Sequence, residues 1–161
     1  MKQFLFAMVI LCAAAMPPAA SAQSRVLTYS DQEIMLASAD PRLAANKRLI
    51  YDFWREVIEG AHTELAEKYL AGAYIQHNPN VPNGLVGFID FFSRRKPVTI
   101  EPRVKSPLVA IVAEGDLVVL SFVHRGGDPK RPESIYTTTW FDMFRVENGK
   151  IAEHWDPALK G

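Results

Sequence analysis

The chain has 161 residues, of which 48% are hydrophobic, with 18 basic and 18 acidic side chains. This length suits one domain with its own hydrophobic core, and the balanced charge gives no electrostatic reason to expect binding to nucleic acid or to a membrane surface. The sequence also lacks the G-x-S-x-G, H-E-x-x-H and glycine-rich phosphate-loop motifs, so nothing in it supports a hydrolase, a zinc protease or a nucleotide-binding protein.

The first 22 residues have the pattern of an export signal. Lys2 precedes an apolar run over 4–15, and Ala-Ser-Ala at 20–22 is a typical cleavage site. The apolar run is shorter than the roughly 20 residues that span a membrane. We therefore expect a periplasmic or secreted protein, cleaved near Ala22 and no longer attached to the membrane. Cleavage would also remove Cys12, the only cysteine, and with it any disulfide or cysteine metal site.

The predicted domain, residues 41–161, begins with helices. An N-terminal extension over 23–40 precedes it and contains a possible short helix. Asp40-Pro41 is a typical helix start, and apolar residues then recur at helical spacing as far as Gly60. The sequence predicts three helices, at 41–60, 63–72 and 85–95. Between the second and the third it predicts an extended segment at 73–77 and a turn region at 78–84.

After Pro97 the apolar pattern alternates, which is typical of strands. Helices followed by a strand meander predict an α+β fold, with the three N-terminal helices packed on one face of a strongly curved antiparallel sheet. Such a cone-shaped interior is a usual place for a small-molecule site. The strands are expected at 104–113, 117–124, 135–146 and 150–156, with a loop at 125–132.

The turn at 147–149 permits two registers of the last hairpin. A two-residue Asn-Gly turn would place Asp142 opposite Trp155, whereas a three-residue turn with a glycine bulge would place Asp142 opposite His154. We prefer the three-residue turn, because a buried carboxylate is less costly beside an imidazole. This register predicts that Asp142, His154 and Asp156 share one face.

Two motifs stand out in the sequence: Tyr74-Ile-Gln-His-Asn-Pro79, and the segment from Phe141 to Asp156, which contains Glu-His-Trp-Asp. Together they resemble the SnoaL-like polyketide cyclase family of the NTF2-like superfamily. The resemblance implies a cone-shaped α+β fold with an apolar pocket, often dimeric through the sheet. It also implies aldol chemistry without metal or cofactor, in which the aspartate of the last strand, here Asp156, is the acid/base.

The sequence and the resemblance together give a set of candidate site residues. Asp156 and His154 are the expected catalytic residues, acting on a small hydrophobic carbonyl compound in a cyclisation, aldol condensation or isomerisation. No metal or cofactor is expected. The expected substrate-binding residues are His77, Asp142, His124, Trp140 and Tyr74, and Trp54 and Phe88 are further candidates for an aromatic wall.

Simpler interpretations of the same residues stay open. Asp156 could be a surface carboxylate, His154 and His124 could be structural histidines, and His77 could cap its own loop. The protein could also hold a small ligand in the cell envelope without turning it over. A third alternative is a zinc or iron site built from Asp142 with the three histidines.

Overall fold

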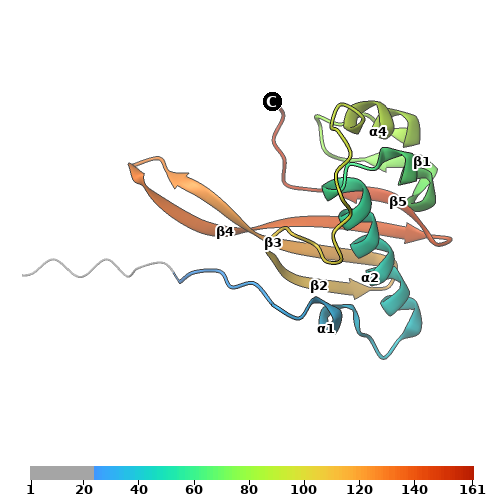
Figure 1. Ribbon diagram of the computed structural model, residues 1–161, viewed down its shortest axis with the longest axis horizontal. Coiled ribbons are helices and arrows are strands. Elements are labelled where there is room, and N and C mark those ends of the chain that lie inside the picture. Colours follow the sequence, from blue (N-terminus) through green and yellow to red (C-terminus); the bar gives the residue numbers. More distant parts are fainter. Residues whose placement is uncertain (1–23) are drawn as a thin grey trace, which may run out of the picture.

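The computed structural model describes residues 24–161, so the predicted signal segment and its cleavage site lie outside the described residues. Six short or medium helical segments precede most of the sheet, and Figure 1 shows their arrangement. They are α1 (Gln32–Leu36), α2 (Pro41–Phe53), a π-helix (Trp54–Glu59), a 3₁₀ turn (Thr63–Leu65) with α3 (Ala66–Tyr69), and α4 (Gly84–Phe92). The strands are β1 (Leu70–Gln76), β2 (Leu108–Glu114), β3 (Leu117–Asp128), β4 (Arg131–Glu147) and β5 (Lys150–Trp155).

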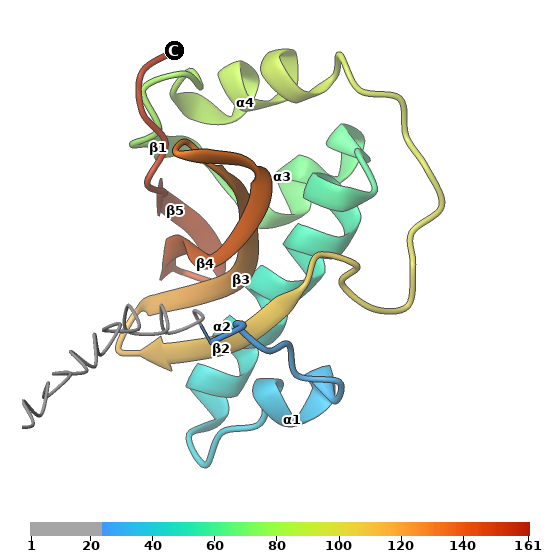
Figure 2. The same cartoon turned by 90° about the vertical axis from the view of Figure 1, so that its left-hand side faces the viewer.

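The five strands form one sheet in the order β1-β5-β4-β3-β2. Its pairs are antiparallel except that β1 runs parallel to β5. Figure 2 shows that the sheet is strongly curved and that α2, α3 and α4 lie on one side of it. The predicted α+β fold is therefore confirmed, with a mixed rather than a purely antiparallel sheet. Within residues 24–161, none of the helices has the length and apolar character needed to cross a membrane.

The predicted helix starts are confirmed to within one residue, whereas two helix ends are wrong. The third predicted helix ends at Phe92 instead of 95. Asp40 caps α2 by accepting a hydrogen bond from the backbone N–H of Arg42 at 2.8 Å. The second predicted helix stops at Tyr69 instead of 72, because Leu70 already begins β1 and pairs with Ile151 of β5. Strand pairing with a distant segment overrides local helix propensity there.

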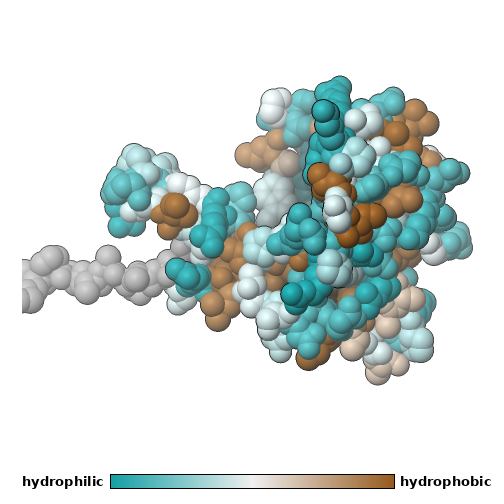
Figure 3. Space-filling model, viewed as in Figure 1, coloured by the Kyte–Doolittle hydropathy of each residue, from teal (hydrophilic) through white to brown (hydrophobic). Residues whose placement is uncertain are grey.

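The loop predicted at 125–132 is wrong. β3 and β4 continue as a two-stranded ribbon to a tight turn at 129–130, and this arm stands off the body of the molecule with a mostly hydrophilic surface (Figures 1 and 3). Gly126 pairs with Tyr136 in the arm, and a Cβ at Gly126 would lie 2.6 Å from the Tyr136 ring. The glycine that suggested a loop instead leaves room for an aromatic ring.

The core centres on Phe53 at the end of α2, a side chain that is almost completely buried. Its ring centroid lies 5.8 Å from that of Tyr69, 5.8 Å from that of Phe88 and 6.0 Å from that of Phe144. These contacts tie α2 to α3, α4 and the concave face of the sheet. The helices are therefore held over the concave face of the sheet at β4.

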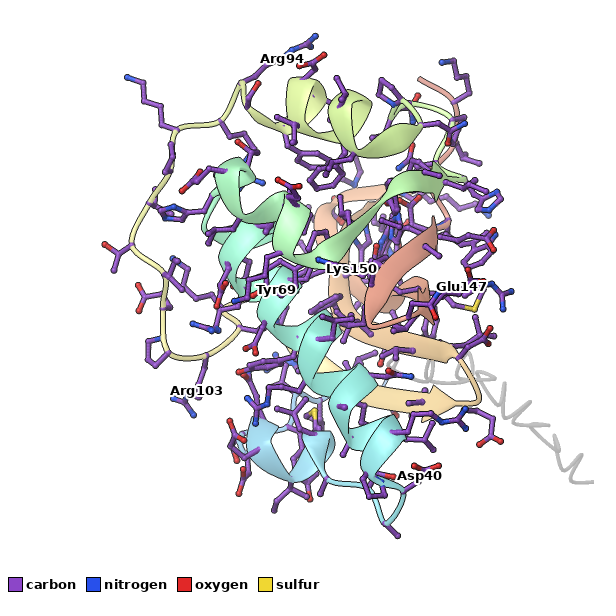
Figure 4. All side chains as sticks on the ribbon, turned by 90° about the vertical axis from the view of Figure 1, so that its right-hand side faces the viewer. Asp40, Tyr69, Arg94, Arg103, Glu147 and Lys150 are labelled. Carbon is purple, nitrogen blue, oxygen red and sulfur yellow. The ribbon has the colours of Figure 1, made fainter. Side chains whose placement is uncertain are left out.

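The register predicted for the last hairpin is wrong. Asn148 and Gly149 both have positive φ, at 51° and 72°, which makes a two-residue type I′ turn, and Glu147 pairs with Lys150 (Figure 4). The pairing then shifts by one residue, because Ala152 forms a bulge. As a result Phe144, not Asp142, lies opposite His154. A two-residue turn without a bulge would direct His154 to the outer face. The bulge at Ala152 directs it to the inner face instead, where the sequence predicts it.

Candidate active site

A cavity of about 110 Å³ lies between the helices and the concave face of the sheet. Its wall combines apolar and polar residues. The apolar residues that line it are Phe53, Trp54, Ile58, Val81, Phe88, Phe92 and Phe144, and the polar ones are Tyr74, Gln76, Asn78, Asp142, His154 and Asp156. An apolar cavity with a few convergent polar groups is the usual form of a small-molecule site.

Asp142 and His154 form a buried pair in the cavity wall. Their side chains are only 5% and 10% exposed, and His154 Nε2 lies 3.1 Å from Asp142 Oδ1. Burial raises the pKa of the Asp142 carboxyl above its ordinary value, although the hydrogen bond with His154 and its charge lower it, and the charge of Asp156 adds to the rise. A carboxyl of this kind retains a proton more readily than one in water.

Gln76 determines which nitrogen of His154 carries a proton. The backbone N–H of Asn78 donates to Gln76 Oε1 at 2.9 Å, and Gln76 Nε2 donates to the Tyr74 hydroxyl at 3.0 Å. The amide oxygen of Gln76 is therefore the atom that faces His154 Nδ1, at 2.9 Å. Because that oxygen can only accept, we assign a proton to Nδ1 from the hydrogen-bond network.

This assignment fixes the number of protons that the pair holds. With Nδ1 protonated, Nε2 either accepts from a protonated Asp142 or belongs to an imidazolium beside a carboxylate. In both forms one further proton lies between Nε2 and Asp142 Oδ1, and the pair has no net charge. The pair can therefore give up one proton and take it back, which is what an acid/base catalyst does.

Asp156 lies beside this pair, immediately after β5. Its Oδ2 accepts from Asn78 Nδ2 at 2.7 Å, and its Oδ1 accepts from the backbone N–H of Ala158 at 2.8 Å. The Asn78 orientation is fixed, because its Oδ1 accepts from the backbone N–H of Asn80. Both contacts are donors, so the Asp156 carboxylate is held in place as an acceptor at the rim of the cavity.

Three further polar atoms complete the site. Burial raises the pKa of the Tyr74 hydroxyl, and the charges of Asp156 and Asp142 raise it further, so this hydroxyl stays protonated. Trp54 Nε1 and Asp142 Oδ2 are buried and have no hydrogen-bond partner within residues 24–161. Buried polar atoms of native proteins nearly always have a partner.

The structure brings some of the predicted site residues together and not others. Asp142, His154, Asp156 and Tyr74 line the cavity, as do Trp54 and Phe88. The roles assigned to these residues stay predictions. His77, His124 and Trp140 are absent from the cavity wall.

His77 points to the outer face of the sheet, so its predicted place at the cavity mouth is wrong. Its Nε2 lies 2.9 Å from Glu153 Oε2, and its ring stacks on Trp155 at 4.6 Å. Glu153 also accepts from Arg145 at 2.8 Å, so an ion pair lies on that face. Strand alternation explains the placement, because His77 follows Gln76 and neighbouring residues point to opposite faces.

His124 and Trp140 lie farther out along β3 and β4. His124 is exposed, although it is in phase with the buried Phe122, because β3 extends past the core into the arm at that point. Its ring centroid lies 5.8 Å from that of half-buried Trp140. The Trp140 side chain is one of the groups that lower the pKa of Asp142, so it acts on the site from beside it.

Gln76 and Asn78 are the site residues that the sequence reading missed. Tyr74, Gln76 and Asn78 are two residues apart, so an extended chain places all three on one face. That spacing was a usable signal, but the histidine between Gln76 and Asn78 was the more conspicuous residue.

The alternative of a metal site built from Asp142 and three histidines is also wrong, because the structure groups different residues. Asp142, His154 and Asp156 are the residues whose candidate ligand atoms lie together, all within 4.8 Å of one another. Two carboxylates and an imidazole are donors that zinc or iron accepts. The same three groups are equally suited to moving protons.

Comparison with known proteins gives one family. A sequence model described as SnoaL-like polyketide cyclase matches residues 48–158. Two similar solved structures are a candidate polyketide cyclase from Acidithiobacillus ferrooxidans, at 19% identity, and a candidate SnoaL-like polyketide cyclase from Jannaschia sp. CCS1, at 16%. The matches cover 74% and 75% of this chain and 89% and 91% of those chains, each with a TM-score of 0.50, which shows a shared fold. No curated protein sequence matches the chain.

Proposed function

Because the chain belongs to the SnoaL-like polyketide cyclase family, we propose that it is a cofactor-free acid/base enzyme that forms an enolate from a small carbonyl compound, in an aldol cyclisation or an isomerisation. The family supports a cyclase- or isomerase-type function in general terms. The observation that carries the specific proposal is the Asp142–His154 pair, which shares one proton beside the separately anchored Asp156. The proposal is supported by the position of this hydrogen-bonded pair and of a separate carboxylate in the wall of one cavity.

Each group then has one task. Asp156 accepts the proton from the carbon next to the carbonyl, because its carboxylate is held by donors and lies at the cavity rim. The Asp142–His154 pair donates its shared proton to the carbonyl oxygen as negative charge develops there. The enol carbon then attacks a second carbonyl in an aldol step, or takes a proton at another carbon in an isomerisation. The enol O–H proton returns to the Asp142–His154 pair, and Asp156 gives its proton to the new alkoxide or to that carbon, so both groups are restored.

Replacement of Asp156 by Asn tests this proposal. Asn keeps the shape of the side chain but cannot accept a proton, so deuterium exchange next to the carbonyl of small ketones in D₂O should fall by roughly 10²–10⁴-fold, the usual contribution of a positioned base. Asp90→Asn is the matched control, since Asp90 is an exposed residue of α4 away from the cavity wall. Full exchange activity in a folded Asp156→Asn protein would exclude Asp156 as the base.

The second candidate is a protein that binds the same compound without converting it. The specific observation in its favour is the aromatic part of the cavity wall, Phe53, Phe88 and Phe92, which suits the apolar body of a small ligand. Mass spectrometry of the denatured purified protein separates the two functions. A ligand recovered unchanged, together with no exchange activity, would favour binding alone.

We further propose that the protein is exported and dimerises through the outer face of the sheet. Export is supported by the charged, apolar and small-residue pattern of residues 1–22. Dimerisation is supported by two apolar side chains of that face, Phe141 and Val112, which are 52% and 56% exposed. A mature N-terminus at Gln23 tests the first proposal. Loss of the dimer in Phe141→Lys, measured by light scattering, tests the second.

A further inference from the structure

Each oxygen of the Asp156 carboxylate is held by a different segment of the chain. Oδ2 accepts from Asn78 Nδ2 at 2.7 Å, and Asn78 begins the turn over residues 78–81 that follows β1. Oδ1 accepts from the backbone N–H of Ala158 at 2.8 Å, which belongs to the tail, residues 157–161, after β5. The orientation of the carboxylate therefore depends on how the turn and the tail are placed relative to each other.

Strand pairing does not fix this placement on its own. The pairing of β1 with β5 reaches Gln76 and His154, and the backbone N–H of His77 then donates to the His154 carbonyl at 2.9 Å. The turn and the tail lie beyond these contacts and outside both strands. Segments beyond the last strand of a domain are poorly ordered unless further contacts tie them down.

The side chain of Asn80 ties the tail to the turn. Its Nδ2 donates to the Leu159 carbonyl at 2.9 Å, and the backbone N–H of Gly161 donates to its Oδ1 at 3.0 Å. In an extended chain such a carbonyl and the N–H two residues later point to the same side, so the amide bonds to the tail as a neighbouring strand would. The Lys160 ammonium adds a hydrogen bond to the Pro79 carbonyl at 2.9 Å. Figures 1 and 2 show the tail beside the loop between β1 and α4.

Asn80 also contacts the residue that anchors Asp156 from the turn. Its backbone N–H donates to Asn78 Oδ1 at 2.9 Å, which leaves Asn78 Nδ2 directed at Asp156. Asn80 thus bonds to the anchor with its backbone and to the tail with its side chain. A substitution of the side chain removes the link to the tail and leaves the backbone contact in place.

We propose that Asn80 is a positioning residue of the candidate active site, which fixes the orientation of the Asp156 carboxylate by joining the tail to the turn. The inference rests on the proposed function, in which Asp156 is the base. Asn80 is exposed and is not part of the cavity wall, so it acts through Asp156 and not on a reacting atom. A displacement of about 1 Å in a reacting group can cost roughly 100-fold in rate, so this orientation matters to the proton transfer.

Asn80→Ala and Asn80→Asp in the full-length protein test the inference. Alanine removes both side-chain bonds, whereas aspartate keeps an acceptor for the Gly161 N–H but sets a second acceptor against the Leu159 carbonyl. Both variants should lower kcat for deuterium exchange by roughly 10- to 100-fold and leave KM unchanged, because the cavity wall stays intact. The urea midpoint should stay close to that of the wild-type protein, since the lost contacts are exposed. Asn46→Ala, in α2 and not in the cavity wall, is the matched control and should keep full activity.

The Asp156→Asn background separates positioning from a general structural role. If Asn80 acts through Asp156, Asn80→Ala should cause no further loss in the residual exchange of Asp156→Asn. The side-chain amide resonances of Asn78 in ¹⁵N-labelled protein report its hydrogen bond to Asp156 without any substrate, and Asn78→Ala identifies them by their absence. They should shift in Asn80→Ala and stay in place in Asn46→Ala.

Three results would overturn the inference: an unchanged kcat in both Asn80 variants, an equal further loss in the double variant, or unmoved Asn78 resonances in Asn80→Ala. Failure of the proposed function gives a different result. Asp156→Asn then keeps full exchange, while the Asn78 resonances still shift in Asn80→Ala. In that case the assignment of Asp156 as the base fails, and the link by which Asn80 orients the Asp156 carboxylate stands.

Discussion

Gln76 gives the sharpest test of the proton assignment, through the pair Gln76→Leu and Gln76→Glu. In the wild-type protein its amide oxygen accepts from His154 Nδ1 at 2.9 Å. Leucine removes that acceptor, and the imidazole is then free to place its proton on Nε2 and donate to an ionised Asp142. The pair would hold one proton fewer and would carry a net negative charge. Glutamate keeps an acceptor and adds a charge that favours the protonated ring.

The stability effect follows from the hydrogen bonds that leucine removes. Gln76 accepts from His154 Nδ1 and from the backbone N–H of Asn78, and it donates to the Tyr74 hydroxyl. Water can replace the contact with the half-exposed Asn78, but it reaches His154 poorly, since that residue is only 8% exposed. A buried donor without an acceptor costs about 1–3 kcal/mol, so we expect Gln76→Leu to lose about 2 kcal/mol of unfolding free energy.

Two measurements check this prediction. Imidazole ¹⁵N chemical shifts report the tautomer of His154, which should be the Nδ1–H form in the wild-type protein and change in Gln76→Leu. In the exchange assay the basic limb of the pH–rate profile should move to lower pH in Gln76→Leu and to higher pH in Gln76→Glu. Urea unfolding gives the free-energy change. An unchanged tautomer in Gln76→Leu, or shifts of the two profiles in the same direction, would refute the assignment.

Two further substitutions address the buried carboxyl and the core. Because the folded-state pKa of Asp142 is raised, its contribution to stability is fully present below its unfolded pKa of about 3.9 and is lost as the pH rises through the folded value. The stability of Asp142→Asn relative to the wild-type protein, measured as the difference in unfolding free energy, should thus increase from acidic to neutral pH. A difference independent of pH in parallel urea titrations would contradict this. Phe53→Ala should lose about 3–5 kcal/mol, because it leaves a cavity among the rings of Tyr69, Phe88 and Phe144. A loss below about 1 kcal/mol would mean that the core collapses onto the gap.

The hairpin shows what the sequence could and could not predict. The sequence predicts Asp142, His154 and Asp156 on one face, and all three line the cavity, but through a different hairpin register from the predicted one. Asn148-Gly149 forms the type I′ turn for which these residues are best suited, and the bulge at Ala152 then restores the inward direction of His154. A bulge depends on how a strand is accommodated between two neighbours, here β4 and β1, so a pattern read along one strand does not reveal it.

The same limit explains the arm and the end of the second helix. Gly126 and the prolines near it resemble a loop in the sequence, yet the opposite strand supplies Tyr136, whose ring fills the space above the glycine. Leu70 resembles the end of a helix until Ile151, far along the chain, pairs with it. In both cases the deciding partner is distant in sequence. Helix starts were predictable because the cap of α2, Asp40, acts on its own near neighbours.

The polar and the apolar residues of the cavity wall come mostly from different elements. Its polar groups come from β1, β4 and β5 or from the residues just after them, whereas most of its apolar wall comes from α2, the π-helix Trp54–Glu59 and α4. Strand pairing fixes β1, β5 and β4 relative to one another, so the spacing of the proton-handling groups depends little on how the helices pack. Helix packing can therefore change the size and shape of the cavity while the acid/base geometry stays the same. Substitutions at Trp54 or Phe92 should alter which compound binds, whereas substitutions at Gln76 should alter what happens to its protons.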